Sequence, residues 1–523
     1  MVKQRLLATA GAAIAGLALA GPAHAATQTD TSALRGAVSA SGINQHQAAL
    51  EAIANANIFN GVPTRATGTD GHWASVDYVE DVMTEAGWTV TKQPFTADIF
   101  YEEGPAAFER TGPPPPEVYT RYDGEDGVWY VADFSADGNG TPAPAIVIDF
   151  VEPTATPSTS NSGCEAADFP AETAGKIVLL QRGTCDFGLK VENAQAAGAV
   201  GAVIFNEGTI GADDRNNVLI PTLAGYNITI PVVGTDYATG RALVDAVNAN
   251  TPVTLALTVN GVSLPGQDTV NVIADSPGGR TDRTVVVGGH LDSVFEGPGI
   301  NDDGSGVSFM METAQQLKEL GLSPRNHLRF IFFSGEEQGL LGSDYYVSQL
   351  TKKEITSISA MLDYDMLGSN NFARLVYDGD GTDFGVAGPN GSGQIEQVFR
   401  EWFNSQNQYF ETIPFDGRSD YDAFTLAGVP AGGIFAGAEV IKTAAQAAPD
   451  KFGGVANTAF DPFYHQLGDT LAHVNNVGLE QLGDAALHAV WTFAQTTSAV
   501  SGTGKASSTS IKPSDWQGDK RFR

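Results

Sequence analysis

The chain has 523 residues, of which 42% are hydrophobic, and its 29 Lys and Arg residues face 61 Asp and Glu residues for a formal net charge of −32. At about 100–200 residues per domain, this length allows two to four domains with sizeable cores. A surface so acidic repels nucleic acid and anionic lipid, so we expect neither as a partner.

The first 25 residues have the pattern of a secretory signal peptide. Lys3 and Arg5 precede an apolar stretch at residues 6–20, and the small-residue site Ala-His-Ala follows at 23–25. This arrangement predicts cleavage after Ala25 and export of the mature chain. No later segment offers the roughly 20 uninterrupted apolar residues that a membrane span requires. We therefore expect a secreted, extracellular protein with no membrane partner.

Residues 26–96 begin the mature chain with helical and extended patterns. An amphipathic helix is predicted at about 75–85, Gly87 ends it, and an alternating strand follows. From residue 97 the composition changes, and "TGPPPPEVY" is typical of a proline-rich turn or spacer. Between about 142 and 257, short strands such as "KIVLLQRG" surround one predicted helix, "KVENAQAAGA".

Two cysteines, Cys164 and Cys185, lie in this middle section. An oxidising compartment favours a local disulfide between them. A catalytic thiol would need an environment that lowers its pKa, and nothing in the surrounding sequence indicates one.

After Pro265, buried-type strands alternate with helical stretches up to about residue 500. Strands such as "TVVVGGHLDS" and "LRFIFFSGEE" alternate with helices such as "GVSFMMETAQQLKEL". This alternation predicts an α/β fold of three layers, in which helices cover both faces of a mixed, largely parallel sheet. The Ser-, Gly- and Lys-rich tail at 501–523 has the composition of a flexible segment.

Polar side chains follow several of these strands at the point where each strand ends. In open α/β sheets, ligands bind outside the carboxyl ends of the strands. The residues in question are His290, Asp292, Asp302, Asp303, Glu336, Glu337, Asp363, Asp365, Tyr464 and His465.

A shared site for these residues would be strongly acidic. Asp302, Glu336, Glu337 and Asp365 would raise one another's pKa if they met at one edge of the sheet. Two divalent cations would neutralise that charge and would also explain the histidines. Histidine and carboxylate ligands suit zinc, and a bridging carboxylate is typical of a two-metal hydrolytic centre. One glutamate of the adjacent pair could then bind metal while the other acts as a base.

Each of these residues also has a plainer interpretation. A strand-end His or Asp is more often a hydrogen-bonded turn residue, and Glu-Glu could simply begin a helix. The plainer interpretation weakens because five such features stand at successive strand ends of one predicted sheet. Motifs of other hydrolase and nucleotide-binding classes, such as H-E-x-x-H, G-x-S-x-G and a Walker-type glycine loop, are absent from the sequence.

The order and spacing of these residues resemble a known family, the secreted di-zinc aminopeptidases of the MH clan, and in particular Streptomyces-type leucine aminopeptidase. The resemblance covers about residues 40–96 and 265–498. It is carried by H-L-D-S at 290–293, G-P-G-I-N-D-D-G-S-G at 297–306, G-E-E-x-G-L-x-G-S at 335–343, D-M-L-G at 365–368, G-R-S-D at 417–420 and Y-H at 464–465.

The resemblance implies a role for each matching position. One zinc would be held by His290 and Asp365, the other by Glu337 and His465, and Asp302 would bridge the two. Glu336 would be the general base and Tyr464 would hydrogen-bond the oxyanion. Asp292 would orient His290. Arg418 and Phe435 match positions that line the substrate pocket of the family.

Around the site, this sequence differs from the family pattern in a cysteine pair and in a possible calcium site. Relatives carry a cysteine pair flanking the Tyr-His segment, whereas Phe463 and Gly468 stand here, so we expect packing alone to hold that loop. Glu480 and Asp484 match places where family members can bind calcium, but no N-terminal acidic partner is found. We therefore expect two zinc ions per chain and leave calcium as an open alternative.

The middle section resembles a protease-associated (PA) domain. The sequence "GKIVLLQRGTCDFGLKVENAQAAGAVGAVIFNE" matches the core of that domain. We expect an insertion at 97–261 with a PA core at about 142–257. The Cys164–Cys185 disulfide would close a loop of about 20 residues, a constraint of about 3 kcal/mol in the chain-entropy model. The insertion would be either a lid that filters substrates or an inert spacer.

We predict a monomeric aminopeptidase, with its peptidase domain at 26–96 and 262–500, that acts on peptides with a free N-terminus. The resemblance implies a preference for a bulky apolar first residue such as leucine. Three alternatives stay open. The first is a zinc carboxypeptidase or aminoacylase on the same scaffold. The second is an inactive binding protein, which the full set of ligand positions disfavours. In the third, the insertion carries the main function as a receptor module.

Overall fold

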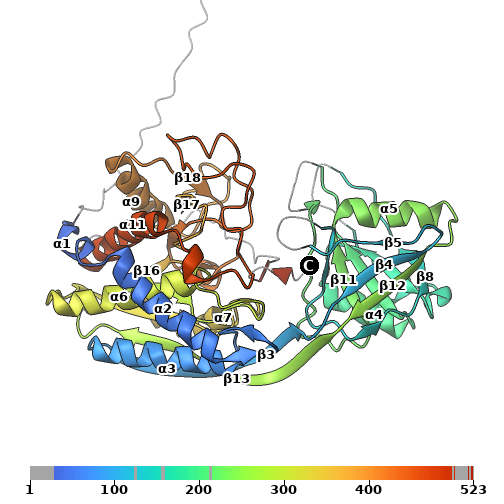
Figure 1. Cartoon of the computed structure of the whole chain (residues 1–523), viewed down its shortest axis with the longest axis horizontal. Coiled ribbons are helices and arrows are strands. Elements are labelled where there is room, and N and C mark those ends of the chain that lie inside the picture. Colours follow the sequence, from blue (N-terminus) through green and yellow to red (C-terminus); the bar gives the residue numbers. More distant parts are fainter. Residues whose placement is uncertain are drawn as a thin grey trace, which may run out of the picture.

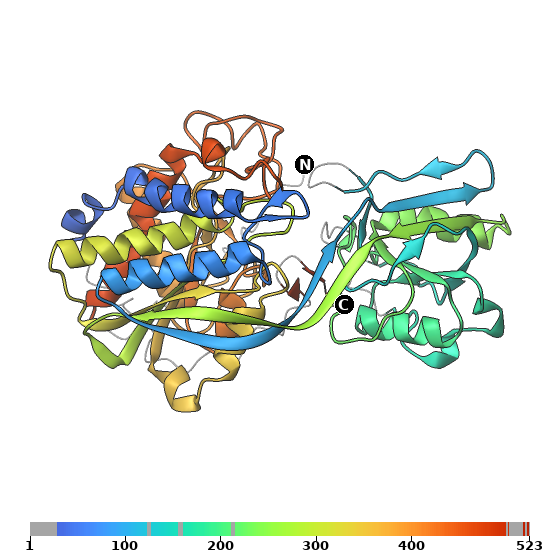
Figure 2. The same ribbon diagram turned by 60° about the horizontal axis from the view of Figure 1, so that its bottom comes forward.

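The protein is represented by a computed structural model that describes residues 29–122, 127–154, 160–210, 215–497 and 500, and the backbone of 516–517 and 520–521. The signal peptide expected at 1–25 lies outside these residues. The chain forms two lobes joined by a pair of long antiparallel strands, β3 (Thr89–Glu102) and β13 (Gly261–Asp275) (Figures 1 and 2).

The larger lobe is built on a mixed sheet with the strand order β18-β17-β19-β16-β14-β15-β13-β3. Its centre is parallel: β14 (Arg280–His290) lies between β15 (Asn326–Phe333) and β16 (Ile358–Asp363), and β16 pairs with β19 (Ala431–Phe435). Antiparallel pairs stand toward both edges, where β13 meets β15 and β17 (Leu375–Tyr377) meets β19, while β18 (Glu411–Ile413) runs parallel to β17. The predicted mixed, largely parallel sheet is confirmed.

Helices cover both faces of this sheet because successive strand side chains point to opposite sides. Val285 and Val287 pack into the main core with α2 (Ala40–Ala56), α3 (Asp70–Glu85), α6 (Gly304–Glu319), α9 (Ser392–Ser405) and α11 (Asn476–Gln495). Val286, between them, points to the opposite face and packs in the cluster that includes residues of α7 (Leu341–Ser348), α8 (Lys352–Ser357) and α10 (Tyr421–Leu426). The three-layer prediction is therefore correct.

The helix predicted at 75–85 begins earlier, at Asp70. The Thr69 side chain accepts a hydrogen bond from the backbone N–H of His72 and caps the helix at its N-terminus. The short helix α1 (Ser32–Arg35) and the small hairpin of β1 (Ile58–Phe59) and β2 (Val62–Pro63) complete the N-terminal segment.

The smaller lobe is built on a second sheet with the order β5-β4-β12-β8-β9-β10-β11-β6, in which β7 also pairs with β12. Its strands are β4 (Ala107–Gly112), β5 (Glu117–Val118), β6 (Trp129–Val131), β7 (Gly138–Asn139), β8 (Ala143–Ile148), β9 (Ile177–Gln181), β10 (Gly201–Phe205), β11 (Val232–Thr235) and β12 (Thr254–Val259). Helices α4 (Phe187–Ala196) and α5 (Tyr237–Asn248) pack against it. The proline-rich stretch forms the turn between β4 and β5.

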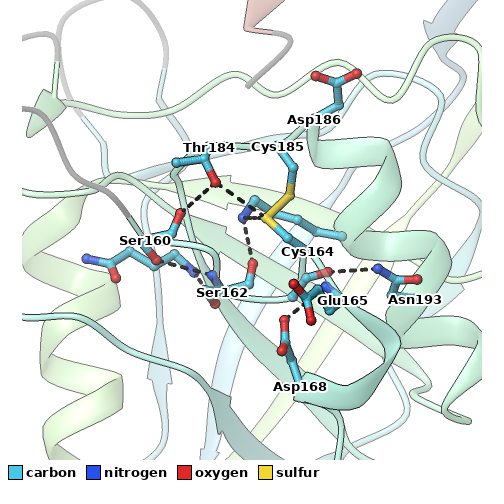
Figure 3. Close-up of a disulfide and its surroundings, with 12 residues drawn as sticks. Ser160, Ser162, Cys164, Glu165, Asp168, Thr184, Cys185, Asp186 and Asn193 are labelled. Carbon is cyan, nitrogen blue, oxygen red and sulfur yellow. Dashed lines mark hydrogen bonds between the residues drawn. A yellow bond between two sulfur atoms is a disulfide. The ribbon is translucent and has the colours of Figure 1, made fainter.

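A disulfide joins Cys164 to Cys185 in the smaller lobe (Figure 3). It links the loop before β9 to the segment that leads into α4. Of the tail at 501–523, the structure describes only the strands β20 (Trp516–Gln517) and β21 (Lys520–Arg521), which pair antiparallel. Among the described residues, no helix combines the length and the apolar character needed to cross a bilayer.

Candidate metal centre

Acidic and imidazole side chains of the larger lobe come together where three strands end and one helix begins. His290 is the last residue of β14, Glu336 and Glu337 follow β15, and Asp365 follows β16. These three strands are parallel neighbours, so their carboxyl ends share one edge of the sheet. Asp302 stands just before α6 and reaches the same edge. The structure brings these predicted residues together at one edge of the sheet.

The Asp302 carboxylate lies between two histidines, one at each oxygen. His290 Nε2 is 3.0 Å from Asp302 Oδ1, and His465 Nε2 is 3.2 Å from Asp302 Oδ2. His465 Nε2 is also 3.1 Å from Glu337 Oε2, and His290 Nε2 is 3.6 Å from Asp365 Oδ1. Two groups, each with one histidine and one further carboxylate, therefore flank a shared aspartate.

Two carboxylate oxygens in this cluster have no hydrogen-bond partner among the described residues. Glu337 Oε1 and Asp365 Oδ1 are both shielded from solvent and accept no hydrogen bond. A buried acceptor without a partner is costly unless an ion satisfies it. Ligand atoms of His290, Asp302 and Glu337 lie within 4.8 Å of one another, and this donor set of imidazoles and carboxylates suits zinc. The residues present therefore fit a metal centre.

The electrostatics of these side chains agree with this interpretation. Burial raises the pKa of Glu337 to about 7 and raises the pKa of Glu336 well above its usual range. Burial would also raise the pKa of Asp302, but hydrogen bonds from His290 and His465 outweigh it and lower that pKa. The pKa of His290 is raised despite burial, because Glu336 and the nearby aspartates attract its positive charge. The cluster holds more negative charge than its histidines balance, as expected of a cation site.

Asp292 contacts the metal centre through two different groups. Its backbone carbonyl lies 3.1 Å from His290 Nδ1, whereas its carboxylate Oδ1 lies 3.7 Å from the same nitrogen. The carboxylate also accepts a hydrogen bond from the backbone N–H of Glu336 at 3.3 Å. The expected contact with His290 is therefore made mainly by the main chain, and the side chain reaches the backbone of the glutamate pair. Elsewhere in the site, Ser419 Oγ donates to Asp365 Oδ2 at 2.8 Å.

Arg65 holds the loop between His290 and Asp302, a role that the sequence did not indicate. Its side chain is fully buried, and its guanidinium donates to three backbone carbonyls of this loop. Nε donates to Pro298 O at 2.9 Å, Nη2 to Gly299 O at 2.5 Å, and Nη1 to Leu291 O. An arginine in the polar, small-residue stretch "PTRATGT" is the only sequence signal of this contact.

The loop that carries Tyr464 and His465 is anchored by hydrogen bonds as well as by packing. The Asp469 carboxylate accepts from the backbone N–H groups of Asn301 and Asp302 at 2.7 and 3.0 Å. Asp461 Oδ2 accepts from Asn301 Nδ2 at 2.6 Å. These contacts tie the His465 loop directly to the backbone of Asp302.

The expectation that packing alone replaces the missing cysteine pair is therefore incorrect. Phe463 does pack, with its ring stacked on His473 at a centroid distance of 3.7 Å. His473 in turn lies 2.7 Å from the carbonyl of Gly468 through Nδ1. Polar side chains on the loop form the rest of the anchor, and their partners could not be identified before the fold was known.

A pocket opens beside the cluster, and the remaining predicted residues line it. Arg418 makes a two-point ion pair with Glu439 at 2.8 and 3.3 Å, and its Nη2 lies 3.4 Å from the Tyr464 hydroxyl. Glu439 was not predicted. The pocket lining combines site residues with apolar side chains, namely Asp302, Glu336, Asp365, Met366, Tyr377, Ile413, Asp416, Arg418, Ser419, Phe435, Ala438, Tyr464 and His465.

Two further sets of predicted residues, the cysteine pair and the residues considered for calcium, lie away from this centre. Cys164 and Cys185 lie in the smaller lobe and take no part in it. Glu480 and Asp484, considered for calcium, have partners in the protein. Glu480 Oε2 accepts from the backbone N–H of Ala40 at 2.6 Å, and Asp484 faces Arg35 at 3.7 Å. The Arg35 guanidinium thus lies beside the Asp484 carboxylate, one of the two groups considered as calcium ligands.

Comparisons with known proteins agree with this geometry. A family model described as peptidase family M28 matches residues 271–490, and a PA domain model matches residues 147–243. The chain is 42% identical over 437 residues to an aminopeptidase of Pseudomonas aeruginosa, covering 83% of this chain and 77% of the relative. It is 41% identical over 347 residues to a probable leucine aminopeptidase 2 of Aspergillus fumigatus, covering 65% of this chain and 66% of that protein.

Solved structures show the same fold. The aminopeptidase from Aneurinibacillus sp. strain AM-1 superposes with a TM-score of 0.65 at 24% identity, covering 91% of this chain and 98% of that one. A zinc aminopeptidase from Bacillus subtilis superposes with a TM-score of 0.55 at 25% identity, covering 88% of this chain and 97% of that one.

Proposed function

Because the chain belongs to peptidase family M28, with a PA domain inserted in it, we propose that it is a secreted zinc aminopeptidase that removes single residues from the N-terminus of peptides. The observation that best supports this proposal is the Asp302 carboxylate, held between two imidazoles, with buried carboxylate oxygens on either side that lack partners.

The proposal assigns two zinc ions to this cluster. His290 and Asp365 would hold one ion, Glu337 and His465 the other, and Asp302 both. When bound, such a pair lowers the pKa of a water molecule and polarises the scissile carbonyl. Calcium is not part of the proposal, because Arg35 and the backbone of Ala40 contact the carboxylates considered for it.

Glu336 is proposed as the general base. It lies at the same edge as Glu337, and its Oε2 is 4.0 Å from His290 Nε2, whereas Glu337 Oε2 is 3.1 Å from His465 Nε2. The proposal therefore assigns Glu337 to the metal and Glu336 to proton transfer. In its deprotonated form this carboxylate would take a proton from the attacking water and pass it to the leaving amine. Tyr464 lines the pocket, and in this proposal its hydroxyl would donate a hydrogen bond to the oxyanion.

The pocket supports a preference for a bulky apolar first residue. Met366, Tyr377, Ile413 and Phe435 contribute apolar surface to its lining. The carboxylates beside them would favour the positive charge of a free amino terminus. We propose leucine-like residues as the preferred first position, and Arg418, held by Glu439, as a residue that contacts the substrate.

The proposal also assigns the boundaries of the segments and domains in the chain. Residues 1–25 would be the signal peptide, 26–96 and 262–500 the peptidase domain, 97–261 the insertion with its PA core at about 142–257, and 501–523 a C-terminal tail. We propose that the mature protein is a monomer and that the insertion restricts which peptides reach the metal centre.

One pair of substrates tests the proposed activity. We expect hydrolysis of leucine p-nitroanilide and no hydrolysis of its N-acetyl derivative, because the site needs a free amine. Metal analysis of the same sample should give two zinc ions per chain. Preferential cleavage of the acetylated substrate would indicate an aminoacylase-type hydrolase instead, and a metal-free protein of full activity would refute the assignment.

A further inference from the structure

The disulfide of the smaller lobe has an asymmetric environment that points to a reaction (Figure 3). Cys164 Sγ lies 3.6 Å from Lys190 Nζ and 3.9 Å from Thr184 Oγ1. The ammonium of Lys190 donates toward this sulfur, and the Thr184 hydroxyl, which also lies 3.4 Å from the Ser160 carbonyl, faces the same sulfur. Within the described part of the chain, no donor contacts the sulfur of Cys185. The two sulfurs of one bond therefore differ in their ability to carry a negative charge.

Lys190 is placed where its charge acts strongly. The side chain is fully buried, and Nζ donates to the Ser162 carbonyl at 2.6 Å. Burial lowers the pKa of Lys190 to about 8, so the amine is still mainly protonated at neutral pH. A cation next to a sulfur favours the thiolate and lowers the pKa of that thiol. Shielding from water makes this effect larger than at an exposed position.

A simple structural role does not require this arrangement. The bond to the Ser162 carbonyl needs one hydrogen-bond donor, which a neutral amide could supply as well. Burying a charged amine for that purpose alone carries a desolvation cost, and the nearby Asp168 carboxylate offsets it only in part, because the pKa of Lys190 is still lowered. The position of the charge beside Cys164 gives the lysine a function that a neutral donor lacks.

We propose that Cys164–Cys185 is a site of directed thiol–disulfide exchange, in which an external thiolate attacks Cys185 Sγ and Cys164 leaves as a thiolate beside Lys190. A bond forms between the incoming sulfur and Cys185 while the S–S bond breaks, and its electron pair passes to Cys164. The incoming sulfur is oxidised to the disulfide level and Cys164 is reduced. A lower pKa of the leaving thiol speeds this step.

The surroundings also define the class of thiol. Asp186 follows Cys185 in the chain, and Glu165 and Asp168 lie on the Cys164 side, as Figure 3 shows. The Glu165 side chain is exposed, and Thr184, beside Cys185, is exposed as well. Acidic groups at an accessible site disfavour an anionic reagent such as glutathione. The site should therefore react best with a neutral or cationic thiol.

The position of the adduct tests the proposed direction. The native full-length protein at pH 7 is treated with limiting cysteamine, a cationic monothiol, then quenched with iodoacetamide and mapped by peptide mass spectrometry. We expect cysteamine on Cys185 and carbamidomethyl on Cys164, in roughly tenfold excess over the reverse pattern. Equal labelling, the reverse pattern, or no adduct on the folded protein would overturn the proposal.

Variants then test the part played by the charge. Lys190→Gln keeps a hydrogen-bond donor but removes the charge, and we expect it to react about tenfold more slowly and with less preference for Cys185. Lys176→Met, a change to a half-buried lysine in the same lobe, should react at the wild-type rate. An unchanged rate in Lys190→Gln would contradict the mechanism.

Further measurements separate an effect on thiol exchange from an effect on folding or on peptidase activity. Thr184→Val removes the hydroxyl near Cys164 Sγ, together with its 3.4 Å contact to the Ser160 carbonyl, at an exposed residue, and should slow exchange by a smaller factor. Thioglycolate, an anionic thiol, should react more slowly than cysteamine at equal thiolate concentration. Hydrolysis of leucine p-nitroanilide should be unchanged in the Lys190 and Thr184 variants, because neither residue belongs to the metal centre.

Discussion

Replacing Arg65 with glutamine should weaken both the fold and the binding of zinc. The guanidinium is fully buried and donates to the carbonyls of Leu291, Pro298 and Gly299, so its removal leaves three buried acceptors short of a charged donor. Hydrogen bonds to charged groups contribute about 1.5–3 kcal/mol each, and breaking a buried charge network costs about 3–5 kcal/mol. We expect a loss of about 3–5 kcal/mol in the free energy of unfolding.

The effect on zinc follows from where these carbonyls lie. They belong to the loop that begins after His290 and ends at Asp302, so a looser loop holds both ligands less well. Loss of a residue that orients metal ligands typically costs 10–100-fold in metal affinity. We expect Arg65→Gln to lose zinc by that factor, and Arg65→Lys, which keeps the charge but not the three-way geometry, to lose less.

Two assays separate these effects, and a matched variant controls for them. Urea unfolding of the metal-free protein reports stability, and competition with a chromophoric chelator reports zinc affinity. Arg329→Gln removes a guanidinium that pairs with Asp275 at 2.7 and 2.9 Å, away from the metal centre. We expect that control to lose some stability and to bind zinc normally. Wild-type zinc affinity in Arg65→Gln would refute the reasoning.

Three more predictions concern the reaction and its pH dependence. Glu336→Gln should lower kcat about 10²–10⁴-fold while zinc content stays at the wild-type level; near-normal turnover would rule Glu336 out as the base. Tyr464→Phe should lower kcat by about 10²–10³-fold with little change in KM, and a change confined to KM would assign the hydroxyl to substrate binding instead. The metal-free protein should lose stability as the pH rises from 5 to 8, on the order of 1–3 kcal/mol. Burial raises the folded pKa of Glu337 to about 7, above its unfolded value, and the pKa of His290 is also raised, so the folded state binds the extra protons. Thermal melts of chelated protein that show rising stability over this range would contradict that account.

The meeting of the carboxylates and histidines was predictable because it follows from the regular part of the fold. His290, Glu336, Glu337 and Asp365 each stand at the end of a strand that is recognisable from its apolar run. Once the strands are parallel neighbours, their ends must meet at one edge. The mixed sheet and its two layers of helices were predictable for the same reason, since periodicity reports which faces are buried.

The supports of the centre were not predictable because they depend on contacts between loops. Arg65 and Asp469 lie far from Asp302 in the sequence, and no periodic pattern links them to it. Glu439 follows a predicted strand as any polar loop residue could. The pairing of Arg418 with this glutamate depends on the path of the loop after β19, which only the folded chain defines. The presence of Phe463 where relatives have a cysteine indicated that a disulfide is missing from this loop. It did not indicate that the Asp461 and Asp469 carboxylates anchor the loop instead.

The way in which the smaller lobe is joined to the larger one makes it a removable module. It enters through β3, of 14 residues, and leaves through β13, of 15 residues, and these strands are hydrogen-bonded to each other (Figure 2). The chain therefore departs and returns at adjacent points, a geometry in which grafting of foreign segments is well tolerated. Cutting both strands and closing them with a tight hairpin would shorten the chain without altering the order of strands in the remaining sheet. Because β3 and β13 form the whole connection, the larger lobe could acquire different inserted domains at this position in the course of evolution.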